Sequence, residues 1–153
     1  GNHHPYNIHM DGDEMVGKVV PLPEKGGETE KITINLGYVD LGRIDLLVQD
    51  AFYSNRTDFI RTAIRNQLTT HAEAVNQSLV RKTLEIGLRD YSRADLEAVK
   101  VAKQKLRIKV LGLARIAADV SPELALATIE SITVLGALQA SREVKTALAE
   151  RIR

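Results

Sequence analysis

The chain contains no cysteine and no tryptophan, and aromatic residues make up only 4% of its 153 residues. Without thiols it can form no disulfide, no thiolate metal site and no thiol-based redox centre. No apolar run approaches the roughly 20 residues that a membrane-spanning helix needs. The first residues also lack the charged-then-apolar pattern of a secretion signal. We therefore expect a soluble, cytoplasmic protein.

Catalytic motifs are lacking as well. The sequence has no glycine-rich phosphate loop, no zinc-ligand spacing and no nucleophile elbow. Three of its histidines lie near the N-terminus and the fourth is His71. Paired acids such as Asp11 and Asp13, or Asp90 and Asp95, have no partner base. We expect neither an enzyme nor a bound cofactor.

The net charge of +1 conceals an uneven distribution. Subtracting Asp and Glu from Lys and Arg gives −4 for residues 1–30, +2 for residues 31–82 and +3 for residues 83–153. The two mildly basic segments suit a protein that makes a few placed phosphate contacts better than a nonspecific nucleic-acid coat.

Residues 1–30 mix glycine, proline, histidine and acidic residues with no sustained period, which predicts a flexible arm. Because the chain begins with glycine, part of this arm can be a cleavage scar instead of native sequence, and Met10 and Met15 are both candidate native starts. Residues 1–3 have the spacing of a copper or nickel chelator. Short histidine-containing arms are more often tags or solvated tails, so we expect no metal site there.

Residues 31–82 show the pattern of one strand followed by helices. Polar and apolar residues alternate over 31–36 at the period of a strand with one buried face, and Gly37 ends it. We expect Asp40 to cap a first helix. Residues 53–56 interrupt that helix, and Ser54 or Asn55 then caps a second one, which we expect to extend to residue 82.

Residues 83–153 repeat a unit of an apolar segment followed by a capped helix. Gly87, Gly112 and Gly136 recur at spacings of 25 and 24 residues, each in or after such a segment. The helix-capping residues that follow are Ser92, Ser121 and Ser141. The pattern predicts three βα units, forming a solenoid-like stack or a small parallel sheet faced by helices. The predicted fold class is α+β, and an exposed terminal strand or helix face is expected to pair with another subunit.

The strand over 31–36 cannot be stable alone, so a second chain must complete it. If two chains pair these strands antiparallel and interlock their helices, the apolar faces are buried together. The expected dimer core comprises Ile32, Ile34, Leu36, Ile44, Leu47, Val48, Phe59, Ile60, Ala63 and Ile64.

The opposite strand face carries Lys31, Thr33 and Asn35. Lysine can donate to guanine, asparagine can pair with adenine, and threonine offers a hydroxyl and a methyl group to base edges. A polar strand face is, however, more often simply solvated. A rival basic face, Lys105, Arg107 and Lys109, alternates with apolar residues in the second half, and there we favour a solvated strand face that discourages aggregation.

Taken together, the strand, first helix, polar break and second helix of residues 31–68 resemble the ribbon-helix-helix family of CopG, Arc and MetJ-type bacterial repressors, and the CopG branch most closely. The resemblance implies a homodimer that inserts a two-stranded β-ribbon into the DNA major groove. It implies that Lys31, Thr33 and Asn35 contact bases. It also implies that the start of the second helix, with Ser54, Asn55, Arg56 and Thr57, contacts phosphate. A nickel-responsive member would need a histidine-rich second half, and this one contains no histidine.

We therefore expect a sequence-specific DNA-binding transcriptional regulator, acting as a repressor, that binds double-stranded DNA as a dimer. Residues 83–153 are expected to join dimers into tetramers or larger arrays. Two alternatives stay open at this point. One is an antitoxin that binds a toxin and regulates its own operon, and the other is a structural oligomer without DNA activity.

Overall fold

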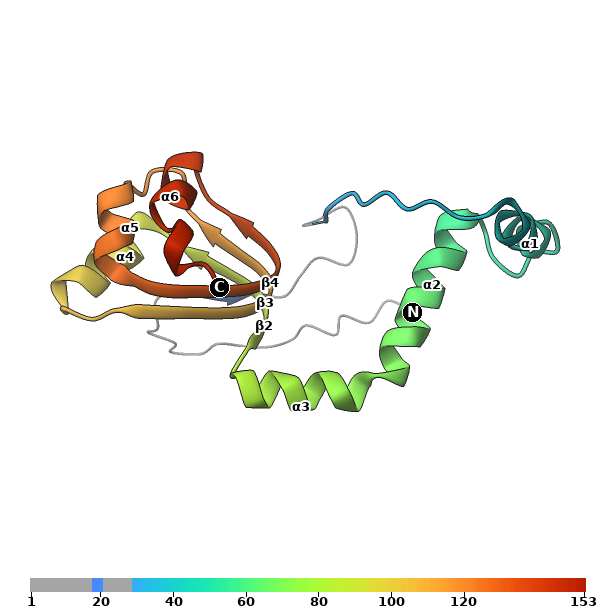
Figure 1. Ribbon diagram of the computed structural model, residues 1–153, viewed down its shortest axis with the longest axis horizontal. Coiled ribbons are helices and arrows are strands. Elements are labelled where there is room, and N and C mark those ends of the chain that lie inside the picture. Colours follow the sequence, from blue (N-terminus) through green and yellow to red (C-terminus); the bar gives the residue numbers. More distant parts are fainter. Residues whose placement is uncertain (1–17, 21–28) are drawn as a thin grey trace. The chain divides into compact units, whose positions relative to one another are not determined.

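The computed structural model describes residues 18–20 and 29–153. It divides into a helical unit, Glu30–Lys82, and a sheet-containing unit built mainly from Thr83–Arg153 (Figure 1). Each unit is described by itself below. No helix in the described ranges is long and apolar enough to cross a membrane.

The helical unit contains α1 (Tyr38–Gln49), α2 (Arg56–Thr70) and α3 (Ala72–Lys82). The prediction that Asp40 caps the first helix is wrong. The helix begins after Gly37, and Asp40 lies in its first turn. Asn55 caps α2, as expected for one of two candidates. The second helix ends at Thr70 instead of continuing, because His71 leaves helical geometry before α3 starts.

Residues 31–36 carry no regular secondary structure in the single chain. A strand is defined by hydrogen bonds to a neighbour, and among the described residues of this chain none pairs with this segment. The expected strand is therefore not formed within one chain.

The sheet-containing unit alternates strands and helices. The strands are β1 (Lys18–Val20), β2 (Glu85–Tyr91), β3 (Leu106–Ile116) and β4 (Ile129–Gln139). The helices are α4 (Arg93–Val101), α5 (Pro122–Thr128) and α6 (Arg142–Ala147), followed by the short η1 (Ala149–Arg151). The strand order is β1-β2-β3-β4; β2, β3 and β4 are parallel, and β1 is antiparallel to β2. The expected mixture of helices and strands is confirmed.

Each helix after a parallel strand begins at a serine cap. The Ser92 hydroxyl accepts from the Asp95 amide at 3.0 Å, that of Ser121 from the Leu124 amide at 3.1 Å, and that of Ser141 from the Val144 amide at 3.2 Å. These three predicted caps are confirmed. Each satisfies one of the backbone N–H groups that a helix start leaves without a partner.

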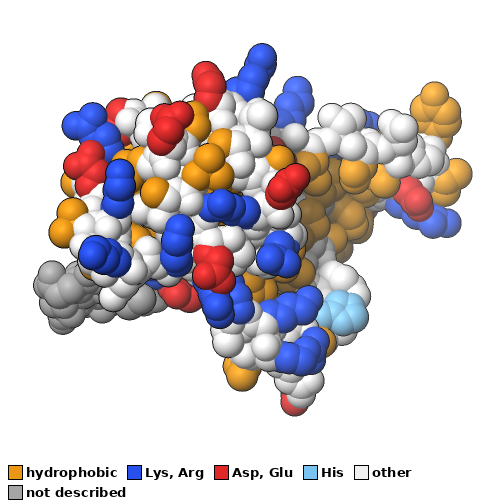
Figure 2. All heavy atoms as spheres, turned by 60° about the vertical axis from the view of Figure 1, so that its left-hand side comes forward, with side chains coloured by type: hydrophobic (Ala, Val, Ile, Leu, Met, Phe, Trp, Pro, Cys, Tyr) orange, Lys and Arg blue, Asp and Glu red, His pale blue; other side chains and the backbone are white. Residues whose placement is uncertain are grey.

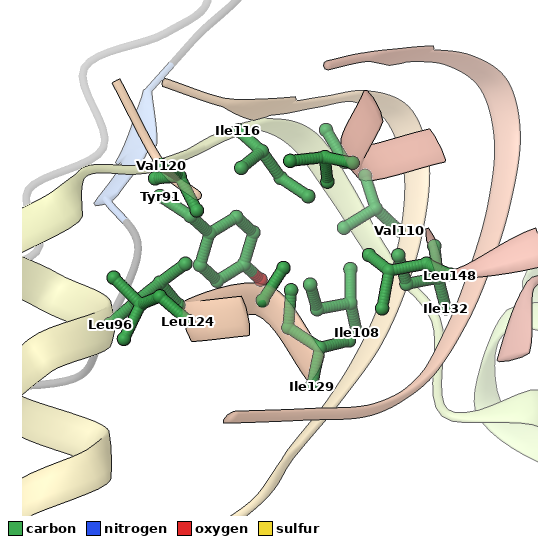
Figure 3. Close-up of a cluster of buried hydrophobic side chains, with 13 residues drawn as sticks. Tyr91, Leu96, Ile108, Val110, Ile116, Val120, Leu124, Ile129, Ile132 and Leu148 are labelled. Atoms are coloured by element: carbon green, nitrogen blue, oxygen red, sulfur yellow. The ribbon is translucent and has the colours of Figure 1, made fainter. Parts of the chain in front are cut away.

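The core of this unit lies between the sheet and its helices (Figure 3). Strand residues Ile108, Val110 and Ile132 are at most 1% exposed, and they pack with Leu96 of α4 and Leu148, which follows α6. Because α4, α5 and α6 all contribute to one cluster, they cover the same face of the sheet.

The three repeated glycines lie side by side across the sheet. Gly87 pairs with Gly112, and Gly112 with Gly136, and their φ angles are 130°, 139° and 124°. A Cβ on Gly112 would lie 2.2 Å from the Gly87 carbonyl oxygen, and one on Gly136 would lie 2.1 Å from that of Gly112. The spacing in the sequence thus reflects one row in which only glycine fits.

Strand β1 falls inside the segment expected to be a flexible arm. Lys18–Val20 pair with Leu88–Asp90, so these three residues extend the sheet instead of lacking structure. The possible chelating residues 1–3 and the candidate starts Met10 and Met15 lie outside the described residues. Within the described ranges, no group of three or more His, Cys, Asp or Glu is placed to hold a metal ion.

Candidate nucleic-acid interface

In residues 31–36, the polar and the apolar side chains are both exposed. The base-contacting candidates Lys31, Thr33 and Asn35 are all exposed. On the alternate positions, Ile32 is 71% exposed, Ile34 59% and Leu36 38%. Leaving Ile32 and Ile34 largely in water is costly, because burying each side chain fully contributes about 1.5–3 kcal/mol. This segment therefore presents an apolar face that one chain does not cover.

The helices show the same incomplete burial. Of the expected core residues in α1 and α2, only Ile44 is buried, at 6% exposure. Ile64 is 47% exposed, and Leu68 in the same helix is 58% exposed. The residues with intermediate burial are Leu47, Val48, Phe59 and Ile60, while Ala63 is exposed. The helical unit of one chain therefore leaves much of its apolar surface unburied.

The start of α2 is fixed by a reciprocal set of hydrogen bonds. The Asn55 side-chain oxygen accepts from the Asp58 amide at 2.8 Å. Asp58 in turn accepts from both the amide and the hydroxyl of Ser54, each at 2.9 Å. The hydrogen bond from the Ser54 amide, and to a smaller extent the one from its hydroxyl, lowers the pKa of Asp58 below its ordinary value. The Ser54 donors are thus used inside the chain, and Asp58 places a negative charge beside the helix start.

Arg56 is held by a carboxylate from the preceding helix. Its Nε donates to Asp45 Oδ1 and one terminal nitrogen donates to Oδ2, both at 2.8 Å. The hydrogen bond from Arg56 is the main cause of a lowered Asp45 pKa. A guanidinium has five N–H donors, so this fork leaves three for another acceptor. Asp45 therefore fixes the direction of Arg56 and uses only two of its five donors.

Sequence reasoning did not find this pair. Asp45 and Arg56 lie eleven positions apart, on opposite sides of the turn between α1 and α2. A further contact in the same turn is the edge-to-face packing of Tyr53 on Phe59, with ring centroids 5.1 Å apart. No short-range pattern predicts either contact, because both depend on how the turn folds back.

The rival basic residues, Lys105 just before β3 and Arg107 and Lys109 within it, all contact other residues of the sheet-containing unit. Arg107 forms an ion pair with Glu130 at 2.8 Å, Lys109 donates to the Thr83 hydroxyl at 3.1 Å, and Lys105 donates to the Ala127 carbonyl at 2.9 Å. Figure 2 shows Lys and Arg side chains interspersed with Asp and Glu on the visible face. Lys105 and Arg107 are exposed and Lys109 is half-buried, and the interpretation of this face as a solvated one stays a prediction.

Comparison with protein families gives a match to the Ribbon-Helix-Helix transcriptional regulator family over residues 27–145. The match includes the segment before α1, all three helices of the helical unit and most of the sheet-containing unit. Comparisons with curated proteins and with solved structures give no match. The match covers well over half of the chain and confirms the resemblance drawn from residues 31–68. The chain belongs to the ribbon-helix-helix family of DNA-binding transcriptional regulators.

Proposed function

We propose that two chains pair residues 31–36 as an antiparallel β-ribbon and that the resulting homodimer regulates transcription as a sequence-specific repressor. The observation that carries this proposal is the exposure of Ile32 and Ile34 at 71% and 59% beside incompletely buried helices. Strand pairing supplies the missing backbone hydrogen bonds, and it buries these isoleucines against the helices of both chains.

In this dimer the face opposite the isoleucines points outward and enters the major groove. It carries Lys31, Thr33 and Asn35 from each chain. Asn35 is suited to adenine and Lys31 to guanine, whereas Thr33 contributes a hydroxyl and a methyl group. Each good bidentate contact discriminates against a wrong base by about 1–3 kcal/mol.

The start of α2 provides the phosphate contact in this proposal. Arg56 offers its remaining donors in a direction set by Asp45, and the exposed Thr57 adds a hydroxyl. Asn55 keeps its amide nitrogen available, since its oxygen is the one that caps the helix. The donors of Ser54 are used by Asp58, so Ser54 contributes by holding the turn.

For the sheet-containing unit we propose an assembly role, joining dimers on neighbouring DNA sites. Its regular parallel strands and capped helices support a folded module. The antitoxin alternative calls for a segment that folds only around its partner, and this ordered sheet argues against it.

The experiment that tests the DNA proposal begins with selection of bound sequences from random DNA. Thr33→Ala and Asn35→Ala are then compared on selected and unrelated DNA. We expect each to reduce discrimination while leaving binding to unrelated DNA nearly unchanged. Asn66→Ala, at an exposed asparagine of α2, is the matched control and should bind like the parent protein.

Repeating the binding at two salt concentrations separates base contacts from phosphate contacts. Arg56→Ala should weaken binding to both kinds of DNA and reduce the salt dependence by about one phosphate contact. Equal discrimination by the parent protein, Thr33→Ala and Asn35→Ala would reject the proposed base readout.

A further inference from the structure

Strand β4 forms an outer edge of the sheet that is long, uncharged from Ser131 onward and open over most of its length. Among the described residues, β3 is the one strand that forms a ladder with it. On the other side, within the described residues, it makes only an isolated parallel bridge between Ile132 and Ile152. Leu135 is 49% exposed, and Gly136 and Gln139 are exposed too. Beyond Ile132, no strand in the described part of the chain pairs with the outer side of this edge.

The bridge at Ile132 shows which backbone groups face outward. Arg153 donates its backbone N–H to the Ile132 carbonyl at 2.8 Å, so this carbonyl points away from β3. Backbone groups alternate sides along a strand. Those of Val134, Gly136 and Leu138 therefore point outward as well, and together they can form a ladder with a partner strand.

Natural sheets protect such edges with charged residues, prolines or very short strands. Residues 131–141 contain no charged residue and no proline, and β4 extends over 11 residues. The opposite edge is different, because it consists of the three-residue β1. An unprotected edge of this length is suited to pairing with another strand.

The sequence of β4 matches itself when it is reversed about Gly136. On each side of this glycine come two apolar residues and then a polar one. In an antiparallel pairing centred on Gly136, the opposed residues are Leu135 with Ala137, Val134 with Leu138, and Thr133 with Gln139. Apolar residues thus oppose apolar ones, polar residues oppose polar ones, and no like charges meet.

We propose that β4 pairs antiparallel with β4 of a second copy of this chain, about a twofold axis at Gly136, and joins two sheets into one. The proposal rests on the assembly role proposed above for the sheet-containing unit and specifies the contact that performs it. The β4 contact itself requires neither the ribbon nor DNA, so the two can be tested separately. Together with a ribbon dimer, it produces assemblies larger than two chains.

The test places charges at the opposed polar positions of the 153-residue chain. In Thr133→Glu/Gln139→Glu, two glutamates face each other at both ends of the pairing. In Thr133→Lys/Gln139→Glu, a lysine faces a glutamate instead. The two positions lie about 20 Å apart along one strand, so the introduced charges interact strongly with one another only across the interface. Within each chain they lie opposite Lys109 and Arg115 of β3, and the comparison at high salt reduces those contributions as well. Both variants share Gln139→Glu, which makes them closely matched.

Sedimentation velocity over a range of concentrations gives the readout. We expect the parent protein and the Lys/Glu variant to form the same large species. The Glu/Glu variant should have a dissociation constant about tenfold or more higher, with a smaller difference in high salt. Circular dichroism verifies that both variants are folded.

Ile86→Lys is the control for association through the sheet face. Ile86 is 61% exposed and lies in the same cross-strand row as Leu135, but in β2 instead of at the β4 edge. This variant should assemble like the parent protein. Loss of assembly in Ile86→Lys, or identical behaviour of the Glu/Glu and Lys/Glu variants, would overturn edge pairing.

Failure of the ribbon proposal gives a different result. If β4 pairs but residues 31–36 do not, the parent protein is a dimer and the Glu/Glu variant is a monomer. If both interfaces exist, the Glu/Glu variant remains a dimer. If only the ribbon exists, the parent protein and both variants are dimers, which overturns the β4 proposal.

Hydrogen exchange of the parent protein provides a measurement that needs no variant. The amides of Val134, Gly136 and Leu138 should become protected as the protein concentration rises. Rapid exchange of these amides at concentrations where the large species dominates would also overturn the proposal.

Discussion

The row of glycines across the sheet allows one substitution to be analysed closely. In Gly112→Ala, the new Cβ would lie 2.2 Å from the Gly87 carbonyl oxygen. That atom belongs to the backbone of β2, so relief requires β2 and β3 to separate. The alanine would also have to adopt a φ of 139°, which L-residues rarely occupy.

Two costs combine in this variant. Backbone strain of this kind costs about 1–3 kcal/mol. Each ladder hydrogen bond lost through separation of the strands costs about 0.5–1.5 kcal/mol more. We expect a total loss of about 3 kcal/mol in the free energy of unfolding of the sheet-containing unit. For a domain of this size, that corresponds to a fall in Tm of about 12 °C or more.

Thermal unfolding followed by circular dichroism, with hydrogen exchange of the β3 amides, measures this effect in the unit concerned. Gly42→Ala is the matched control, because a Cβ at this position in α1 would meet nothing within 4 Å. Alanine should stabilise that helix by up to about 1 kcal/mol. A Gly112→Ala protein with unchanged Tm and unchanged β3 exchange would refute the steric reasoning.

Two further predictions concern pH. The pKa of Asp45 is lowered chiefly by its hydrogen bond from Arg56, so its contribution to stability is present above the unfolded pKa of about 3.9 and is lost as pH falls through the lower folded value. Acid titration of unfolding should therefore show a weaker dependence in Asp45→Asn, and an unchanged curve would contradict the pair. Burial raises the pKa of Tyr91 above 10.0, so its contribution is present below pH 10 and is lost as pH rises through the folded value. Tyr91→Phe should flatten the loss of stability at alkaline pH, and an equally steep loss would contradict this assignment.

Local sequence signals predicted a good part of the fold. Asn55 was one of two candidate caps for α2, and Ser92, Ser121 and Ser141 cap the helices after the parallel strands, because a cap depends on residues within one turn. The start of α1 was missed by three residues, because the predicted cap was Asp40 and the observed cap, Gly37, supplies no side-chain signal. Strand β1 was missed because three residues carry too little periodicity to be recognised.

The sequence indicated which residues of the candidate interface are exposed, but it did not indicate how their side chains are held. Alternation in residues 31–36 distinguished the polar from the apolar face. The assignment of Lys31, Thr33 and Asn35 to bases came from family resemblance and stays a prediction. The fork between Arg56 and Asp45 could not be predicted, because it joins residues that meet only after the turn between α1 and α2 has folded.

The sequence by itself determined the glycine spacing, the asparagine and serine helix caps and the alternating segment before α1, because each arises from residues close together in the chain. Only the tertiary structure decided what these features do together. It aligned Gly87, Gly112 and Gly136 in one row where backbone oxygens exclude a side chain. It also left the uncharged part of β4 at an outer edge, since hydrogen bonding between strands is set by sheet order, which no local pattern contains.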